Sequence, residues 1–290
     1  MTKQSITKVV FSIFLMLFMN MACNKNAYDI PYAGDKIVVN GFVDNEQGCV
    51  VAISKTGPAS GNFDYDRNEV KEAHVFLFEN GVQIAELTRD NTKNFVLKKL
   101  SPKIGAKYVL KVTASGLPDA ESEEVLYEAI PQISNVRTEV KEGLVFNRKG
   151  VLFTFKLDFD TTKTNYFLVK TYGDADQVGG FFFNLTNINY SCDVFSFYYD
   201  LLFSTKCLTS GTDIKQGIDV YNPKTSGQSS SVTLKISSIP KAYFEYQQYS
   251  DQLYKSINAA LLEPDYHLPN IKNGYGNFYT KNYKMLTVKL

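Results

Sequence analysis

Residues 73–87, AHVFLFENGVQIAEL, decide the fold class, because an Asn-Gly pair there separates two runs rich in apolar residues. Asn80 and Gly81 readily adopt the positive φ angles that a type I′ turn requires. Two such runs joined by Asn-Gly predict a β-hairpin. We therefore expect a mainly β protein built from antiparallel strands.

Strand patterns continue on both sides of this hairpin. In KYVLKVTA, residues 107–114, the side chains of Tyr108, Leu110 and Val112 alternate with more polar ones, which is typical of a strand with one buried face. Further strands are expected in KIVVNGFV (36–43), CVVAIS (49–54) and NFVLKKL (94–100). Together these segments predict an N-terminal β-sandwich domain over residues 36–130.

A second β domain is expected over residues 131–290. The pattern breaks at Ile130-Pro131, where the proline pushes the preceding residue towards an extended conformation. The segment VLFTFKLDF (151–159) then alternates apolar and polar side chains from Phe153 onward, and YFLVKTY (166–172) and VTLKI (232–236) follow in the same style. The 21 Phe and 19 Tyr of the chain suit such pleated, half-buried surfaces.

One amphipathic helix is predicted at about residues 240–260, packed on the second sheet. Ser238 is a candidate N-cap, and Pro240 suits a first helical turn. Apolar side chains recur at three- and four-residue steps, which predicts a packing face. This face comprises Ile239, Ala242, Tyr246, Tyr249, Leu253 and Ile257.

The first 22 residues have the order of a secretory signal: Lys3 and Lys8, an apolar run, then small residues before Cys23. The apolar run is shorter than the roughly twenty residues that span a bilayer. An Ala-Cys junction after such a run is typical of a bacterial lipobox, so lipidation of Cys23 is expected, with residues 23–35 as a tether. The alternative is that Cys23 is incidental and the mature protein is freely soluble outside the cytoplasm.

Composition argues against a nucleic-acid partner. The chain carries 31 basic and 30 acidic residues, and loss of the signal changes the formal net charge from +1 to −1. Binding to nucleic acid depends largely on basic side chains that neutralise phosphates. No such charge excess exists here.

The remaining cysteines are predicted to have structural roles. An oxidising compartment permits disulfides. Cys192 and Cys207 flank the aromatic run DVFSFYYDLLF, and a hairpin-like fold of this run could bring the two thiols together. A Cys192–Cys207 bridge is therefore a tentative prediction. Cys49, within GCVVAIS, reads as a small buried apolar residue.

No catalytic, cofactor or metal site is predicted. The chain has two histidines, and no catalytic motif with a known mechanism occurs. We interpret His74 as a structural residue of a strand. We interpret His267, Glu263 and Asp265 as ordinary polar residues of a loop. Asp64, Asp66 and Glu69 lack the full spacing of a calcium loop. Carboxylate pairs that meet only in the folded protein remain open, so a glycan-acting hydrolase stays an alternative.

The richest binding candidate is the aromatic stretch at residues 179–203, GGFFFNLTNINYSCDVFSFYYDLLF. Alternation along a strand would send half of its aromatic side chains to each face, and exposed aromatic patches mark interaction sites. Burial of both faces within the fold is the competing interpretation. The candidate partner or ligand residues are Phe181, Phe182, Phe183, Tyr190, Phe197, Tyr198 and Tyr199.

The C-terminal order of strand, Tyr-rich helix and NIKNGYGNF (270–278), with IVVNGFV, EAHVFLFENG and IGAKYVLKV, resembles the Bacteroidetes lipoprotein family of domain of unknown function 4249 (DUF4249). The resemblance covers nearly all of the mature chain. It implies two β-sandwich-like domains of immunoglobulin or carboxypeptidase-regulatory type. In NIKNGYGNF, Gly274 and Gly276 would allow a close backbone approach, with Tyr275 and Phe278 packed beneath it.

The resemblance also implies a role at the outer membrane, on either the cell surface or the periplasmic face. Members tend to be encoded beside TonB-dependent receptors, which implies an accessory subunit that captures a glycan or peptide ligand without covalent chemistry. No catalytic residue carries over from the family. The alternative role is a structural or adhesive module of the cell envelope.

Overall fold

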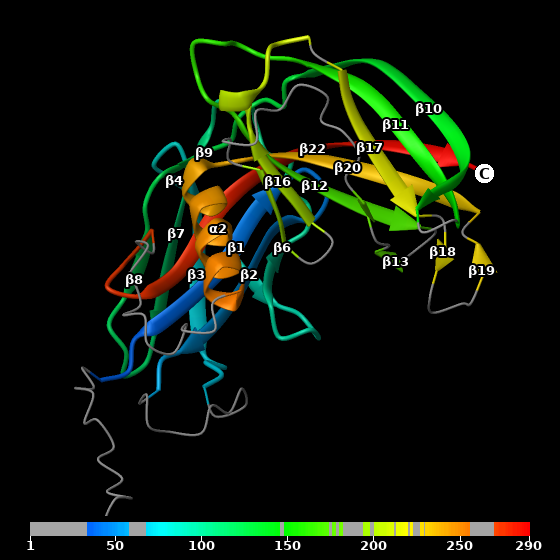
Figure 1. Ribbon diagram of the computed structural model, residues 1–290. Helices are drawn as coiled ribbons and strands as arrows, with labels where there is room; N and C mark the ends of the chain where they lie inside the picture. Colours follow the sequence, from blue (N-terminus) through cyan, green and yellow to red (C-terminus); the bar gives the residue numbers. More distant parts are fainter. Residues whose placement is uncertain are drawn as a thin grey trace, which may run out of the picture. The chain divides into compact units, whose positions relative to one another are not determined.

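A computed structural model describes residues 34–57, 68–145, 148–173, 176–177, 180–181, 194–197, 200–211, 213–219, 221–222, 227–228, 230–255 and 270–290. Contacts divide the chain into two units. One comprises residues 1–35 and 56–68, and the structure describes few of these. The other, Lys36–Lys55 with Glu69–Leu290, contains all the elements below and is shown in Figure 1.

The predicted hairpin is confirmed. Strand β3 (Ala73–Glu79) pairs antiparallel with β4 (Val82–Glu86), and Asn80 and Gly81 between them have φ angles of 50° and 81°. Both angles are positive, as a type I′ turn requires. The turn is tied to the next strand, because the Asn80 side chain accepts the backbone N–H of Lys107 at 3.0 Å.

The described part of the chain is mainly β, as predicted, with one α-helix and one short 3₁₀ helix. The helices are α2 (Lys241–Lys255) and η1 (Thr205–Cys207). The other strands before residue 130 are β1 (Ile37–Asp44), β2 (Gly48–Lys55), β5 (Thr88–Arg89), β6 (Phe95–Leu97), β7 (Lys107–Ala114), β8 (Ala120–Ser122) and β9 (Val125–Leu126). Those after it are β10 (Gln132–Val145), β11 (Arg148–Asp158), β12 (Tyr166–Gly173), β13 (Asp176–Gln177), β14 (Gly180–Phe181), β15 (Val194–Phe197), β16 (Asp200–Ser204), β17 (Asp213–Asp219), β18 (Tyr221–Asn222), β19 (Gly227–Gln228), β20 (Ser231–Ile239), β21 (Ile271–Lys272) and β22 (Tyr275–Lys289).

A ten-stranded sheet runs through this unit, in the order β15-β16-β12-β20-β22-β1-β2-β6-β5, with β13 beside β12. A six-stranded sheet (β21-β8-β7-β3-β4, with β9 on β7) and a four-stranded sheet (β10-β11-β17-β14) complete the main layers. Strands β18 and β19 form a separate pair.

The first core lies between the β1–β2 side of the ten-stranded sheet and the six-stranded sheet. Its fully buried side chains include Val39 and Val51 from one layer and Leu77 and Leu110 from the other. Phe278, from the C-terminal strand β22, is also fully buried here. The C-terminal end of the chain therefore completes a core that is otherwise built from residues before 130.

The second core packs the β12–β20 side of the ten-stranded sheet against the four-stranded sheet. Phe153 and Phe155 of β11 meet Phe167 of β12 and Ile236 of β20, each at most 1% exposed. The alternation seen in the sequence at residues 151–159 corresponds to this buried face. Two sandwich-like cores thus share one sheet.

Helix α2 covers the other face of that sheet, as predicted (Figure 1). The predicted Ile239 is buried in this cluster, but the buried helix residue, Phe244, was not predicted. Phe244 is 1% exposed and packs on Tyr166, with ring centroids 5.0 Å apart. The expected packing residues Ala242 and Tyr246 are instead exposed. Because the helix carries aromatic side chains on several faces, periodicity alone did not identify the face anchored by Phe244.

The predicted N-cap at Ser238 is wrong. Ser238 and Ile239 are still in strand β20, where Ser238 pairs with both Phe167 and Asn282. The helix begins at Lys241, and its first backbone bond runs from the Phe244 N–H to the Pro240 carbonyl at 3.2 Å. The strand therefore extends to the residue before Pro240.

Strand β22 lies between β20, with which it is antiparallel, and β1, with which it is parallel. The glycines predicted to allow close approach do so: a Cβ on Gly274 would lie 2.6 Å from the Ile37 carbonyl oxygen, and one on Gly276 would overlap the Val39 carbonyl. Phe278 is buried as expected, but Tyr275 is 37% exposed, with the Lys36 ammonium 5.5 Å from its ring centroid.

Candidate functional site

The aromatic stretch predicted from the sequence lies largely outside the described residues. Phe181 ends strand β14, and Phe197 ends β15. Five of its predicted binding residues fall where the structure makes no description: Phe182, Phe183, Tyr190, Tyr198 and Tyr199. Its role in binding stays a prediction.

The cysteine predictions have mixed outcomes. Cys23 and Cys192 lie outside the described residues, and Cys207 ends the 3₁₀ helix η1, so the predicted bridge stays a prediction. Cys49 is a free thiol with no exposed surface, in the first core, as expected. Burial raises the pKa of this thiol far above its ordinary value, so Cys49 is no nucleophile.

The polar residues considered for chemistry are engaged in ordinary surface pairs where the structure describes them. His74 Nδ1 lies 2.7 Å from a carboxylate oxygen of Glu86 on the neighbouring strand. Glu69 pairs with Arg89 and lies 3.5 Å from the Lys93 ammonium. Within the described ranges, His, Cys, Asp and Glu side chains form no group able to hold a metal ion.

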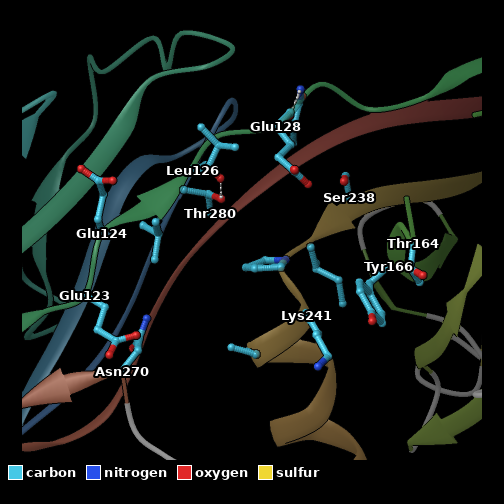
Figure 2. Close-up of a pocket in the computed structure, with 15 residues that line it drawn as sticks. Glu123, Glu124, Leu126, Glu128, Thr164, Tyr166, Ser238, Lys241, Asn270 and Thr280 are labelled. Carbon is cyan, nitrogen blue, oxygen red and sulfur yellow. Dashed lines mark hydrogen bonds between the residues drawn. The ribbon is translucent and has the colours of Figure 1, made fainter. Parts of the chain in front are cut away.

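A pocket of about 300 Å³ instead emerges where strand β9 and strand β22 face the start of helix α2 (Figure 2). One wall is formed by the segment that follows β8 and by the adjoining part of β22. This wall contributes Glu123, Glu124, Val125, Leu126, Glu128, Asn270, Thr280 and Asn282.

Hydrogen bonds hold this wall in place. The Asn270 amide clamps the backbone of Phe278 in both directions, with bonds of 2.5 and 2.8 Å. Thr280 donates its hydroxyl to the Leu126 carbonyl at 2.7 Å, and the Asn282 amide donates to the Glu128 carbonyl at 3.1 Å. These polar side chains are therefore committed to the backbone, and the wall is preorganised.

The opposite wall comes from the junction between β20 and α2. It consists of Ser238, Ile239, Pro240, Lys241 and Ala242, joined by Thr164 and Tyr166 at the start of β12. Because β20 runs into the helix through a single proline, the first turn of α2 is placed directly at the pocket. Figure 2 shows Glu123 and Glu124 on the side across from Lys241 and Tyr166.

The pocket is lined by charges of both signs. Glu124 lies 2.5 Å from the Lys107 ammonium, and Lys241 lies 3.2 Å from the Glu245 carboxylate one helical turn away. This pairing also raises the pKa of Lys241. Glu123 and Glu128, which also line this wall, are exposed to solvent.

The pocket also has apolar lining residues that are almost completely buried. Val125, Ile239 and Tyr166 are at least 92% buried. Ser238 is 5% exposed and also lines the pocket. An apolar pocket with a few converging polar groups is typical of a small-molecule binding site.

Sequence reasoning missed this pocket altogether. Its walls come from segments around residues 125, 165, 240 and 280, and each segment alone looks like an ordinary strand end or loop. The one available signal was EVLYE at 124–128, where two glutamates flank three apolar or aromatic residues. That signal gives no indication of which segment lies opposite.

A second titratable cluster lies inside the shared sheet. Asp44 is fully buried; one of its oxygens accepts the N–H groups of Gln47 and Glu46 at 2.6 and 3.0 Å, and the other lies 3.3 Å from the Lys281 ammonium. That ammonium also lies 3.4 Å from the ring centroid of Phe42. Neither Asp44 nor Lys281 lines a described pocket, so we interpret the pair as structural.

Burial lowers the pKa of Lys281 to about 8 from an ordinary value of 10.5, although Asp44 opposes the shift. Between these two values the unfolded chain binds more protons than the folded one, so the free energy of unfolding should rise by about 1 kcal/mol per pH unit. Above pH 10 the slope should reverse, because burial raises the pKa of Tyr108 and Tyr127 to about 12. Urea titrations at pH 8, 9 and 10 measure the free energy of unfolding and so test the predicted rise.

The matched variant is Lys281→Met. It should be less stable at every pH, because Asp44 loses its buried counter-ion, yet its stability should not rise between pH 8 and 10. An unchanged rise in the variant would assign the slope to another group.

Comparison with known proteins gives a family and distant structural likenesses. The profile of the family described as "Domain of unknown function (DUF4249)" matches residues 24–287. No curated protein matches the sequence. Within the described residues, no helix has the length and apolar character needed to cross a bilayer.

Three solved structures show limited similarity. Drosophila OTK extracellular domains 3–5 are 9% identical, with 73% of this chain and 64% of that chain covered and a TM-score of 0.21. Chicken CNTN1 FN1–FN3 domains are 10% identical, with 69% and 59% covered and a TM-score of 0.22. The yeast delta-COP-I mu-homology domain, solved with a Dsl1 WxWxV peptide, is 11% identical, with 71% and 80% covered and a TM-score of 0.21. The chain thus spans less than two thirds of the first two.

Proposed function

Because the chain belongs to the DUF4249 family over residues 24–287, we propose that it is a lipid-anchored binding protein of the outer membrane. In this role it captures a ligand for a TonB-dependent receptor and performs no covalent chemistry. The observation that carries the proposal is the N-terminal sequence, in which Lys3 and Lys8, an apolar run and Ala22 lead to Cys23.

Lipidation at Cys23 would fasten an otherwise hydrophilic body to the bilayer. Each acyl methylene buried in the membrane contributes about 0.8 kcal/mol, so two or more chains hold a protein firmly. The short polar segment at residues 23–35 would then serve as the tether.

The described body supports binding as its activity. The pocket between β22 and α2 is lined by the buried apolar side chains of Val125 and Ile239 and by the exposed carboxylates of Glu123 and Glu128. It offers neither a histidine nor a cysteine among its lining residues. Such a set of groups can recognise and orient a ligand.

The anchoring is tested with Cys23→Ala, expressed in the native host. The unaltered protein should sediment with membranes and its N-terminal peptide should carry acyl chains by mass spectrometry, whereas the variant should lose both properties. Cys49→Ala, a change in the buried core, is the matched control and should leave anchoring intact. An unmodified, uncleaved start in the unaltered protein would overturn the proposal.

The partner is tested on the same membranes. Affinity capture of the intact protein should recover a TonB-dependent receptor, and deletion of its gene should impair uptake of one nutrient. Recovery of surface proteins or glycans with normal uptake would favour the structural or adhesive role instead.

A further inference from the structure

We propose that two copies of this chain associate through the outer edge of strand β10, which pairs antiparallel with β10 of the second copy. This strand ends the four-stranded sheet, and among the described residues its one strand partner is β11 (Figure 1). An edge strand presents a row of backbone N–H and C=O groups that can pair with another chain. The same edge of a second copy would supply the partners for these groups.

The middle of β10 is open to solvent on both faces. The strand is 14 residues long, and the consecutive residues 135–140 are all exposed. Successive side chains of a strand point to opposite faces of the sheet. Exposure of every residue in this run therefore leaves both faces accessible to a partner.

The core-side face of β10 carries apolar side chains that the second core does not cover. Thr138 lies opposite Phe153 of β11 and Val140 lies opposite Val151, and both of these β11 side chains are at most 1% exposed. Val140 itself is 45% exposed, and Val136 is 42% exposed. Removal of such apolar surface from water favours association.

The charges of β10 are complementary to those of a second copy. An antiparallel pairing centred on Thr138 places Arg137 opposite the second copy's Glu139 and Val136 opposite its Val140. Opposite charges that face each other across antiparallel strands are stabilising, and so are Thr–Thr pairs such as the one at the centre. A two-fold axis through Thr138 makes each of the other contacts twice.

Neighbouring registers fit less well. A pairing centred on Glu139 would place two glutamates opposite each other and Arg137 opposite Lys141, and like charges in such positions are destabilising. A pairing centred on Val140 would match Glu139 with Lys141 but would extend beyond the exposed run. The pairing centred on Thr138 keeps its matched pairs, residues 136–140, within that run.

The ion pairs within one chain leave both charged groups accessible. The Arg137 guanidinium donates to Asp213 at 3.1 Å, and Glu139 lies 3.2 Å from the Lys141 ammonium. The side chains of Arg137 and Glu139 are nevertheless 69% and 62% exposed. Because a guanidinium has several N–H donors, Arg137 can bind a second carboxylate while it keeps the first.

Disulfide cross-linking tests the contact and its register on membranes of the native host. Under mild oxidation, Thr138→Cys in the full chain should give a product of twice the mass on a non-reducing gel. Directly opposite Cα atoms of antiparallel strands lie about 4.5–5.5 Å apart, which suits a disulfide. Val140→Cys is the matched control, because its two copies would lie four residues out of register, about 13 Å apart. The unaltered protein gives the background from the native cysteines.

Charge exchange tests the complementarity. Sedimentation of the intact protein in detergent should show a dimer, and Arg137→Glu or Glu139→Arg should weaken dimerisation about tenfold or more, because two attractive pairs become repulsive. The double exchange should restore the dimer. Lys141→Gln is the control, since Lys141 would face an uncharged asparagine, and thermal melts confirm that each variant is folded.

Four results would overturn the assignment. They are a monomeric unaltered protein at micromolar concentration, equal cross-linking of Thr138→Cys and Val140→Cys, a cross-linked product that contains a different protein, and no recovery of the dimer in the double exchange. A product with a different protein would assign the edge of β10 to that partner.

Discussion

A chain that ends at Asn270 should fail to fold into either sandwich-like core. Removal of residues 271–290 deletes β21 and β22, and β22 is the strand that lies between β20 and β1. The first core loses Phe278 and Ile271, and the second loses the partly buried Leu286 and Val288 that pack against it. Loss of Phe278 alone should cost about 3–5 kcal/mol, a large share of the roughly 5–15 kcal/mol that stabilises a typical domain.

Circular dichroism and thermal unfolding measure this effect. The truncated chain should show no cooperative transition and no near-ultraviolet signal from packed aromatic side chains. A chain that lacks only Lys289 and Leu290, both exposed, should melt like the intact protein. A cooperative transition in the longer truncation would show that one core is stable without β22.

Gly276→Ala should be the most destabilising single substitution in the parallel pairing of β22 with β1. Gly276 has a φ of +96°, and an added Cβ would overlap the Val39 carbonyl oxygen and lie 2.8 Å from its carbon. The backbone of either strand would have to move, which would disturb the register at Phe278. We expect a loss of about 3–5 kcal/mol in the free energy of unfolding.

Gly105→Ala is the matched control for backbone strain. Gly105 has a similar φ of +83°, but an added Cβ there would meet no heavy atom within 4 Å. This variant should lose about 1 kcal/mol, the cost of a positive φ angle for a side chain. Equal losses in urea unfolding of the two variants would mean that close approach to Val39 contributes nothing.

Local patterns predicted much of the fold. The Asn-Gly pair at residues 80–81 predicted the hairpin. Alternation predicted strands at residues 107–114 and 151–159, which correspond to the observed β7 (Lys107–Ala114) and β11 (Arg148–Asp158). These features depend on neighbours in the sequence. Pairing between strands that are far apart in the sequence does not depend on sequence neighbours. The parallel pairing of β22 with β1 was therefore indicated by nothing in the sequence beyond Gly274 and Gly276.

The helix and the pocket show where prediction from sequence stops. Phe244 and Tyr246 have similar hydrophobic character, and only the position of Tyr166 beneath the helix decides which one is buried. Likewise, Glu128 reads as a solvated acid until β22 and α2 are placed beside it. The candidate site is a property of the tertiary arrangement, while the lipobox-like Cys23 is a property of the sequence alone.

The pairing of β1 with β22 also has a kinetic consequence. Contacts such as the one between Asn45 and Tyr283 join positions 238 residues apart, so the mean sequence separation of contacts is large. Folding rates of single domains fall as this separation grows. We therefore expect the first core to form late in folding, because it includes Phe278, which lies near the end of the chain. Until β22 pairs with β1, that edge of the β1–β2 hairpin should remain unpaired.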